Sequence, residues 1–232
     1  MSKPDPARSP AGGPGDARLS RASVHRFSLY LRHVQRFVRE GAQTVSSVQL
    51  GEALSFTDTQ VRKDLAYLGN LGQPGIGYPA QELIDALRHR LGIDRTWTTV
   101  VAGVGNLARA LLRYRGFEQQ GFQFVALFDA DPKKIGQKID GLEVYDPARM
   151  AEVVAHLKAE LAVVAVPAEA AQGVTDALVA AGVLGILNFA PTVVRLPKGV
   201  SLVSVDLAVQ LEQLAFLVQL HQQGDDGDKP DG

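Results

Sequence analysis

The most informative stretch of the chain is VVAGVGNLARA, residues 100–110. An apolar run leads there into a Gly-x-Gly-x-x-Ala turn made of Gly103, Val104, Gly105, Asn106, Leu107 and Ala108. The first glycine of such a turn permits a tight bend after a strand, and the second lets the backbone approach a pyrophosphate. The third position packs the following helix against the strand. Because the amides that open the helix face the phosphates, the stretch predicts a dinucleotide-binding turn.

A second apolar stretch ends in ALFDAD, residues 126–131, and places Asp129 at 21 residues after Ala108. An acidic residue at this distance is expected to bond the hydroxyls of the adenine ribose. Its carboxylate would repel a 2′-phosphate, so the sequence favours NAD(H) over NADP(H) as the cofactor. Two alternatives stay open, namely a structural turn that binds nothing and a site for coenzyme A.

From residue 97 onward, apolar strands alternate with amphipathic helices. This alternation predicts an α/β domain in which a parallel sheet is covered on both faces. Strands are expected near 98–103, 122–128, 161–166, 184–188 and 201–205. Helices are expected near 106–115, 147–158, 168–181 and 207–221.

The part of the chain before residue 97 has a different pattern. A helix is expected over 19–40, with an apolar stripe of Phe27, Leu31, Val34 and Val38. Two short helices follow, the first capped by Ser46 with Gln49 and the second by Thr57 with Gln60. This is the spacing of a helix-turn-helix. The Gly- and Pro-rich stretch 69–80 suits a hairpin loop, which would form a wing. A linking helix is expected to follow, with Pro79 near its start.

The second short helix carries one basic face. Thr59, Arg62, Lys63 and Ala66 share that face, opposite an apolar stripe, and Gln60 and Tyr67 flank it. Such residues suit a helix laid in the major groove of DNA, whereas the alternative is an ordinary solvated helix face. Residues 17–96 carry 11 Lys and Arg against 7 Asp and Glu, a net charge of +4, whereas residues 97–232 have a net charge of −5. This asymmetry favours two modules with different partners.

Composition excludes several classes of site. The chain has no cysteine, which excludes disulfides, Cys-based zinc sites and thiol nucleophiles, and we predict no metal site. No apolar run approaches the roughly 18 residues of a membrane span. The stretch 1–18 lacks the apolar core of a signal peptide, so we expect a cytoplasmic protein.

The sequence offers no candidate catalytic residue for an enzyme that transfers hydride. No Tyr-x-x-x-Lys occurs, and the only histidines after the nucleotide turn are His156 and His221. The sheet and its helices take up the remaining chain and leave no substrate domain. We therefore predict no catalytic residue and no enzyme. A small NAD-dependent oxidoreductase with a fused interaction domain is the alternative.

Eight segments together resemble the redox-sensing transcriptional repressor family Rex. They are VSSVQLGEAL (45–54), QVRKDLAYLGNLG (60–72), GIGY (75–78), VAGVGNLARALLRYRGF (101–117), ALFDADPKKIG (126–136), VPAEAAQ (166–172), GILNFAP (185–191) and SVDLAVQLEQL (204–214). The resemblance implies a homodimer that binds double-stranded operator DNA and is released by NADH as the effector. It also implies a winged-helix domain, a Rossmann-like domain and a last helix swapped between subunits. The expected segments are a disordered tail at 1–18, the winged helix at 19–80, the linking helix at 81–96, the NAD(H)-binding domain at 97–205, the dimerisation helix at 206–222 and a second disordered tail at 223–232.

The resemblance also assigns individual residues. The DNA-binding set is Ser46, Ser47, Thr59, Gln60, Arg62, Lys63 and Tyr67, with Arg62 and Lys63 in the recognition helix. Residues 103–108 would cradle the pyrophosphate and Asp129 would hold the ribose, while the pair Val166 and Pro167 would end a strand beside the cofactor. Arg32, Tyr114 and Asp206 resemble the polar trio that couples the nicotinamide pocket to the DNA-binding domain, and Tyr114 and Asp206 would also contact the cofactor.

Simpler interpretations of these residues stay open. Arg32 suits a solvated helix charge, Tyr114 suits packing at a helix end, and Asp206 suits an N-cap. The apolar stripe of the last helix, residues Leu207, Leu211, Leu214 and Val218, could pack within one chain instead of forming a dimer seam. In the wing, Gln73 and Pro74 stand where the family usually has a Lys or Arg, so the wing is expected to attract phosphates more weakly.

Overall fold

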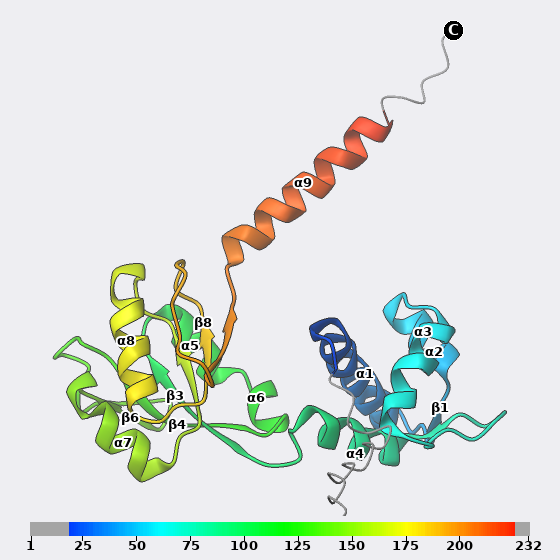
Figure 1. Ribbon diagram of the computed structural model, residues 1–232, viewed down its shortest axis with the longest axis horizontal. Helices are drawn as coiled ribbons and strands as arrows, with labels where there is room; N and C mark the ends of the chain where they lie inside the picture. The colour runs from blue at the N-terminus through cyan, green and yellow to red at the C-terminus, as the bar shows by residue number, and fades with distance from the viewer. Residues whose placement is uncertain (1–18, 226–232) are drawn as a thin grey trace, which may run out of the picture. The chain divides into compact units, whose positions relative to one another are not determined.

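The computed structural model describes residues 19–225 and divides into two compact units between Arg95 and Thr96. The expected tail at 1–18 and residues 226–232 of the second tail lie outside the described residues. Each unit is built around its own hydrophobic core. The ribbon of Figure 1 labels many of the elements named below.

The first unit is helical, with a small hairpin. Its elements are α1 (Arg21–Arg39), β1 (Thr44–Val45), α2 (Ser47–Leu54), α3 (Asp58–Leu65), the 3-10 helix η1 (Ala66–Leu68), β2 (Tyr78–Pro79) and α4 (Ala80–Leu91). The core is made by one face of α1, with Phe27, Leu31 and Val34, packed against Leu83 and Leu87 of α4. The apolar spacing predicted for α1 is therefore confirmed.

Local capping explains where α2 and α3 begin. Ser46 and Gln49 form the expected capping box, with the Ser46 side chain accepting from the Gln49 N–H and the Gln49 side chain accepting from the Ser46 N–H. Thr57 caps α3 by accepting from the N–H of Gln60. The Gln60 side chain, however, donates to Asp64 at 3.0 Å. The second cap thus differs from the first, because a buried carboxylate one turn further along engages the glutamine side chain.

The wing is a tight hairpin between η1 and β2. The backbone N–H of Gln73 donates to the carbonyl of Gly77 at 2.8 Å, and the N–H of Gly77 donates back at 3.0 Å. Pro74 and Gly75 occupy the bend, where Gly75 has a φ of +79°, a conformation that favours glycine. The base of the hairpin continues into the antiparallel pair β1–β2. The predicted hairpin loop is confirmed.

The second unit is a seven-stranded sheet in the order β5-β6-β4-β3-β7-β8-β9. The strands are β3 (Trp97–Ala102), β4 (Phe122–Phe128), β5 (Lys138–Ile139), β6 (Leu142–Tyr145), β7 (Leu161–Val164), β8 (Gly185–Asn188) and β9 (Ser201–Ser204). All strand pairs are parallel except β5 with β6. Without β5, this is the 3-2-1-4-5-6 strand order of a Rossmann sheet.

Five helices accompany this sheet among the described residues, together with one short 3-10 helix. They are α5 (Asn106–Arg113), α6 (Gly116–Gln119), α7 (Met150–Leu157), α8 (Ala168–Ala180) and α9 (Leu207–Asp225), and the 3-10 helix η2 (Pro147–Arg149) precedes α7. The main strands and helices were predicted. The short elements α6, β5 and β6 were not, because they are too brief to show a periodic pattern. The last helix also continues beyond residue 222.

The two faces of the sheet are covered differently. On one face, α7 and α8 pack beside each other (Figure 1) over apolar side chains such as Val100 and Ala162. The opposite face contains Val101 and Val163, and α5 covers it through Ala108. This cover stops short of β8 and β9, where Val203 is 60% exposed. The expectation that helices cover both faces is therefore wrong for this part of the sheet.

Candidate functional site

The turn after β3 requires glycine at its first position. Gly103 has a φ of +89°, and a Cβ built there would lie 2.5 Å from the carbonyl oxygen of Ala165. The Gly103 N–H donates to the carbonyl of Phe128 at 2.8 Å. The turn is thus pressed between the ends of β4 and β7, so that a side chain at residue 103 would force neighbouring backbone to move.

Gly105 has a different reason to lack a side chain. It is the N-cap of α5 with a φ of −85°, which any residue can adopt, and a Cβ built there meets no atom within 4 Å. The fold therefore leaves open space above this backbone. Ala108, which is fully buried, sets α5 close to the sheet. Because the first amides of a helix have no partner within the helix, this cradle fits the pyrophosphate of a dinucleotide.

Asp129 lies at the end of β4 and faces the same turn. Its Oδ2 accepts from the backbone N–H of Val104 at 2.8 Å and from Nζ of Lys134 at 2.8 Å, and its Oδ1 accepts from the N–H of Asp131 at 2.9 Å. Burial alone would raise the pKa of the Asp129 carboxyl, but these hydrogen bonds bring it below its ordinary value. The carboxylate is therefore ionised and still has acceptor capacity on Oδ1 for a ribose hydroxyl.

Lys134 was missed by the sequence reasoning, although it lies within the segment ALFDADPKKIG. Its ammonium pairs with Asp129 Oδ2 at 2.8 Å, and its side chain is partly exposed. The signal available in the sequence was a lysine in a loop, five residues after Asp129. A loop conformation that returns Lys134 to Asp129 cannot be derived from such spacing.

Val166 and Pro167 lie beside this turn, at the end of the neighbouring strand. Pro167 is the N-cap of α8, and the Val166 Cγ1 would lie 2.8 Å from a Cβ added to Gly103. β3 and β7 are neighbours in the sheet, and the chain leaves them toward opposite faces through α5 and α8. Ligands of open parallel sheets bind in the crevice at such a switch point. The structure thus brings residues 103–108, Asp129, Val166 and Pro167 together.

The three residues predicted to couple the two functions lie on separate elements. Arg32 is exposed on α1 of the first unit, whereas Tyr114 and Asp206 belong to the second unit. Tyr114 follows α5, is exposed, and packs edge-on against Phe117. Asp206 Oδ1 accepts from the N–H groups of Ala208 and Val209 and so caps α9. The simpler interpretations of Tyr114 and Asp206 therefore describe their contacts, and the coupling role stays a prediction.

Arg62 is the centre of the predicted DNA surface. Its Nη1 pairs with Asp58 at 2.6 Å and contacts Ser47 Oγ at 3.4 Å, while its Nη2 donates to Thr59 Oγ1 at 3.3 Å. The hydrogen bond from Arg62 lowers the pKa of the Asp58 carboxyl. These contacts hold the guanidinium beside the first residues of α2 and α3.

A cleft of about 400 Å³ lies between Arg62 with the start of α2 on one side and the wing on the other. Its walls are formed by Ser46, Ser47, Arg62, Gly72, Gln73, Pro74, Gly75, Ile76, Gly77 and Tyr78. Lys63 and Thr59 are also exposed on α3, whereas Gln60 is engaged with Asp64 and Tyr67 packs partly against the core. The predicted DNA residues thus separate into an exposed group around Arg62 and two that also support the fold.

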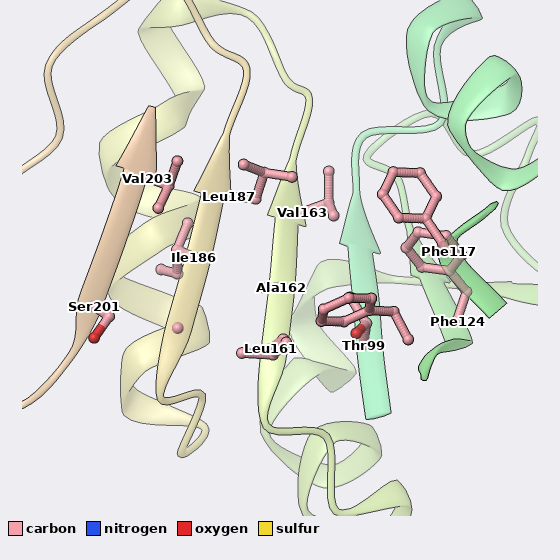
Figure 2. Close-up of a pocket in the computed structure, with 12 residues that line it drawn as sticks. Thr99, Phe117, Phe124, Leu161, Ala162, Val163, Ile186, Leu187, Ser201 and Val203 are labelled. Carbon is pink, nitrogen blue, oxygen red and sulfur yellow. The ribbon is translucent and has the colours of Figure 1, made fainter. Parts of the chain in front are cut away.

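An apolar hollow of about 360 Å³ lies on the incompletely covered face of the sheet. We call this surface the open half-face and define it by Thr99, Phe117, Phe124, Leu161, Val163, Leu187, Ser201 and Val203. Figure 2 shows Val203 at one end of it, Phe117 and Phe124 at the other, and Val163 and Leu187 between them. Sequence reasoning missed this surface, because it depends on which strands α5 fails to reach.

Over residues 19–225, no helix is both long and apolar enough to cross a membrane. Within the same range, no three His, Cys, Asp or Glu side chains gather as a metal site would require.

Comparison with known proteins agrees with both units. A family model described as "Putative DNA-binding protein N-terminus" matches residues 18–66, and one described as "CoA binding domain" matches residues 94–192. A relative from Carboxydothermus hydrogenoformans, named redox-sensing transcriptional repressor Rex, is 46% identical over 202 residues, covering 87% of this chain and 97% of the relative. This chain belongs to the Rex family. Its Rossmann-like sheet and helical N-terminal unit are the architecture expected of a Rex repressor.

Solved Rex-family structures extend the match to the whole architecture. The crystal structure of RSP in complex with beta-NAD+ and operator DNA is 31% identical, has a TM-score of 0.84, and the match covers 93% of this chain and 100% of that one. The crystal structure of RSP in complex with beta-NADH is 30% identical, with a TM-score of 0.81, and covers 91% and 99% of the two chains. These are ligands of that Rex-family protein.

Proposed function

We propose that this chain is a transcriptional repressor that senses the NADH/NAD+ ratio, binds operator DNA as a homodimer, and is released from DNA by NADH. The observation that carries the proposal is the presence of two separate sites in one Rex-family chain. A crevice suited to a dinucleotide lies at Gly105 and Asp129, and a basic cleft lies at Arg62. We place the protein in the cytoplasm and regard it as a regulator rather than an enzyme.

Three features of the crevice support NAD(H) as its ligand. The open space above Gly105 admits a pyrophosphate, the amides that begin α5 donate to it, and Asp129 accepts from a ribose hydroxyl. Coenzyme A carries a phosphate on that ribose, which the ionised Asp129 would repel, although Lys134 offsets part of this charge. The carboxylate therefore favours a free ribose diol over a phosphorylated one.

The first unit supports binding to duplex DNA. Arg62 and Lys63 are exposed on α3, and Arg62 shares the cleft with Ser46, Ser47 and the wing. A helix of this kind enters the major groove while the wing follows the backbone or the minor groove. On binding, Arg62 would exchange Asp58 for a phosphate or a guanine edge, either of which can accept two N–H groups of the guanidinium at once. The uncharged wing residues Gln73 and Pro74 lower the number of phosphate contacts.

Two apolar surfaces support the homodimer, namely the helix α9 and the open half-face. Along α9, Leu207, Leu211, Leu214 and Val218 form one stripe, and Val209, Phe216 and Leu220 form a second stripe about half a turn away. A helix that is apolar on opposite sides is normally buried on both. Every side chain of residues 207–222 is nevertheless exposed in the single chain. We propose that α9 of a second copy fills the open half-face.

Asp206 offers a physical link between the cofactor and this dimer. Its carboxylate caps α9, so a change in what Asp206 contacts changes how α9 begins. NAD+ and NADH differ in the charge and planarity of the nicotinamide ring, which a carboxylate or an arginine such as Arg32 can distinguish. A ligand shifts the dimer only by its difference in affinity for the two arrangements.

The deciding experiment titrates a DNA complex with each nucleotide. In a gel shift on a palindromic operator, NADH should release the protein at concentrations where NAD+ does not. Calorimetry with NADH, NAD+ and coenzyme A identifies the ligand of the crevice, and by linkage operator DNA should weaken NADH binding by the factor by which NADH weakens DNA binding. A shifted band that NADH leaves untouched contradicts the sensor, and turnover of NADH with a carbonyl substrate favours the oxidoreductase.

A further inference from the structure

A buried carboxylate joins the helix α3 to the helix α1. Asp64 of α3 is 2% exposed. Its Oδ2 accepts from Arg26 Nε at 2.5 Å and from the Tyr30 hydroxyl at 2.8 Å, and its Oδ1 accepts from Arg26 Nη2 at 2.7 Å and from Gln60 Nε2 at 3.0 Å. We call Arg26, Tyr30, Gln60 and Asp64 the Asp64 cluster. Two of the residues that donate to Asp64, Arg26 and Tyr30, come from α1 and lie one turn apart.

The protonation of the cluster is well defined. Burial alone would raise the pKa of the Asp64 carboxyl, but the hydrogen bonds from Arg26, Tyr30 and Gln60 bring it below its ordinary value. Burial, together with the hydrogen bond to Asp64, raises the pKa of the Tyr30 phenol. At neutral pH, Asp64 is therefore an acceptor for all four bonds and Tyr30 remains a donor.

Such a cluster contributes more to geometry than to stability. A buried ion pair gains little over apolar side chains of similar volume, because removing its charges from water is unfavourable. Apolar contacts, however, are not directional, whereas the three hydrogen bonds from Arg26 and Tyr30 of α1 to one carboxylate restrict both the rotation and the axial position of α3. Arg62 and Lys63 directly precede Asp64, so their directions depend on that rotation. At a radius of about 5 Å, a turn of about 20° moves a side chain by nearly 2 Å, which is enough to break a hydrogen bond to a base.

We propose that Asp64 is a positioning residue for DNA recognition, because its bonds to Arg26 and Tyr30 set the rotation at which α3 presents Arg62 and Lys63 to base edges. This inference rests on the proposed function, since it requires α3 to lie in the groove of a duplex. It assigns a DNA-related role to two buried side chains, those of Tyr30 and Asp64, and to the partly buried side chain of Arg26.

The variant Asp64→Asn distinguishes a positioning role from a purely electrostatic role, because the two predict opposite changes in operator affinity. It removes a negative charge beside two basic residues, so charge alone would tighten binding to any DNA. Positioning requires the opposite for the operator, and we expect about tenfold weaker operator binding, which is comparable to the effect of one mismatched base pair. Binding to a scrambled duplex should stay equal or become tighter. The matched control Glu40→Gln removes an exposed carboxylate from the end of α1 and should follow the electrostatic expectation for both duplexes.

The experiment measures fluorescence anisotropy with two probes at one salt concentration. One probe is a palindromic duplex selected from random sequence by the wild-type protein, and the other is its scrambled counterpart. Tyr30→Phe keeps the packing and removes one hydrogen bond, so we expect about threefold weaker binding to the selected duplex only. The double variant Arg26→Met/Asp64→Leu replaces the ion pair with apolar side chains. We expect it to unfold at a temperature at least as high as Asp64→Asn and still to lack preference for the selected duplex.

The possible outcomes are distinct. The positioning role is overturned if Asp64→Asn and Tyr30→Phe keep the wild-type preference, or if the double variant regains that preference together with its stability. Loss of preference with retained folding supports it. If the wild-type protein itself selects no sequence, the proposed function fails and the positioning role fails with it, whereas a selective wild type with unaffected variants overturns the positioning role alone.

Discussion

The carboxylate of Asp129 accepts a hydrogen bond from the backbone N–H of Val104 at 2.8 Å. This bond joins the end of β4 to the glycine turn after β3, so one side chain both shapes the turn and faces the ribose side of the crevice. Lys134 pairs with the same carboxylate oxygen. We therefore expect the charge of the Asp129 side chain, and not only its length, to determine which nucleotide the crevice accepts.

The variant Asp129→Asn should reduce NADH affinity by about tenfold, because it weakens a charge-assisted bond to the ribose and releases Lys134. NADPH affinity should fall less or rise, since the carboxylate no longer repels the 2′-phosphate. Calorimetry with both nucleotides measures the change in preference. The control Asp140→Asn makes the same charge change at a residue that pairs with Arg113 instead. An equal loss for NADH and NADPH would contradict the assigned role of Asp129.

Replacement of the exposed basic residues of α3 should affect DNA alone. Arg62→Ala and Lys63→Ala are each expected to weaken operator binding and to lower the salt dependence by about one ion where the side chain contacts a phosphate. NADH affinity should not change, because the crevice belongs to the other unit. Binding is measured across a salt series. Arg39→Ala, at the exposed end of α1, is the matched loss of one positive charge, and an equal effect there would refute specific contact by α3.

The open half-face and α9 lead to a prediction about assembly. Leu214→Glu on α9 and Val203→Glu on the sheet should each shift the protein from dimer to monomer in sedimentation, because both place a charge in an apolar contact. Operator affinity should fall with dimerisation, since two half-sites are then bound separately. Gln219→Glu introduces the same charge on the side of α9 that lies between the two apolar stripes. A Val203→Glu protein that remains fully dimeric would show that the second copy docks elsewhere.

The Asp64 cluster gives the first unit a defined dependence on acid. Because the pKa of Asp64 is lowered in the folded state, the carboxylate stabilises the fold at every pH above its unfolded value of about 3.9. That stabilisation is lost as the pH falls from there through the lower, folded value. In acid titrations of thermal unfolding, wild type should therefore lose more stability below about pH 4 than Asp64→Asn does. Parallel curves for the two proteins would mean that another carboxylate controls acid unfolding.

Local features of the sequence were sufficient to predict much of this structure. The capping residues Ser46 and Thr57 and the apolar stripe of α1 are set within one or two turns of helix, and the structure contains them. The spacing from Ala108 to Asp129 also placed the aspartate at the turn, because a strand-helix-strand unit has little freedom in length.

Features that depend on distant parts of the chain were not predictable in this way. Asp64 pairs with Arg26, which lies 38 positions earlier in the chain. Asp64 also accepts from the Gln60 side chain, which therefore does not take part in the capping expected at Thr57. The open half-face exists because α5 ends before it reaches β8 and β9. No local pattern encodes which strands a helix leaves uncovered. The second apolar stripe of α9 was readable in the sequence but overlooked, because the first stripe alone satisfied the pattern of an amphipathic helix.

The two glycines of the nucleotide turn should respond to the same substitution in different ways. Gly103→Ala places a methyl group 2.5 Å from the Ala165 carbonyl oxygen, at a φ of +89°. We expect a loss of about 1–3 kcal/mol from backbone strain, and more from the clash. A clear fall in the unfolding temperature of the second unit, seen in calorimetry, is the measurable result.

Gly105→Ala should leave that unfolding temperature nearly unchanged, because its φ suits any residue and the added methyl meets no protein atom. The methyl instead occupies the space where a pyrophosphate would approach the backbone, so NADH affinity should fall by about tenfold or more. Such a protein should still bind its operator and should no longer be released by NADH. If Gly105→Ala binds NADH as wild type does, the pyrophosphate does not lie over this turn, and the crevice must hold its ligand in another orientation.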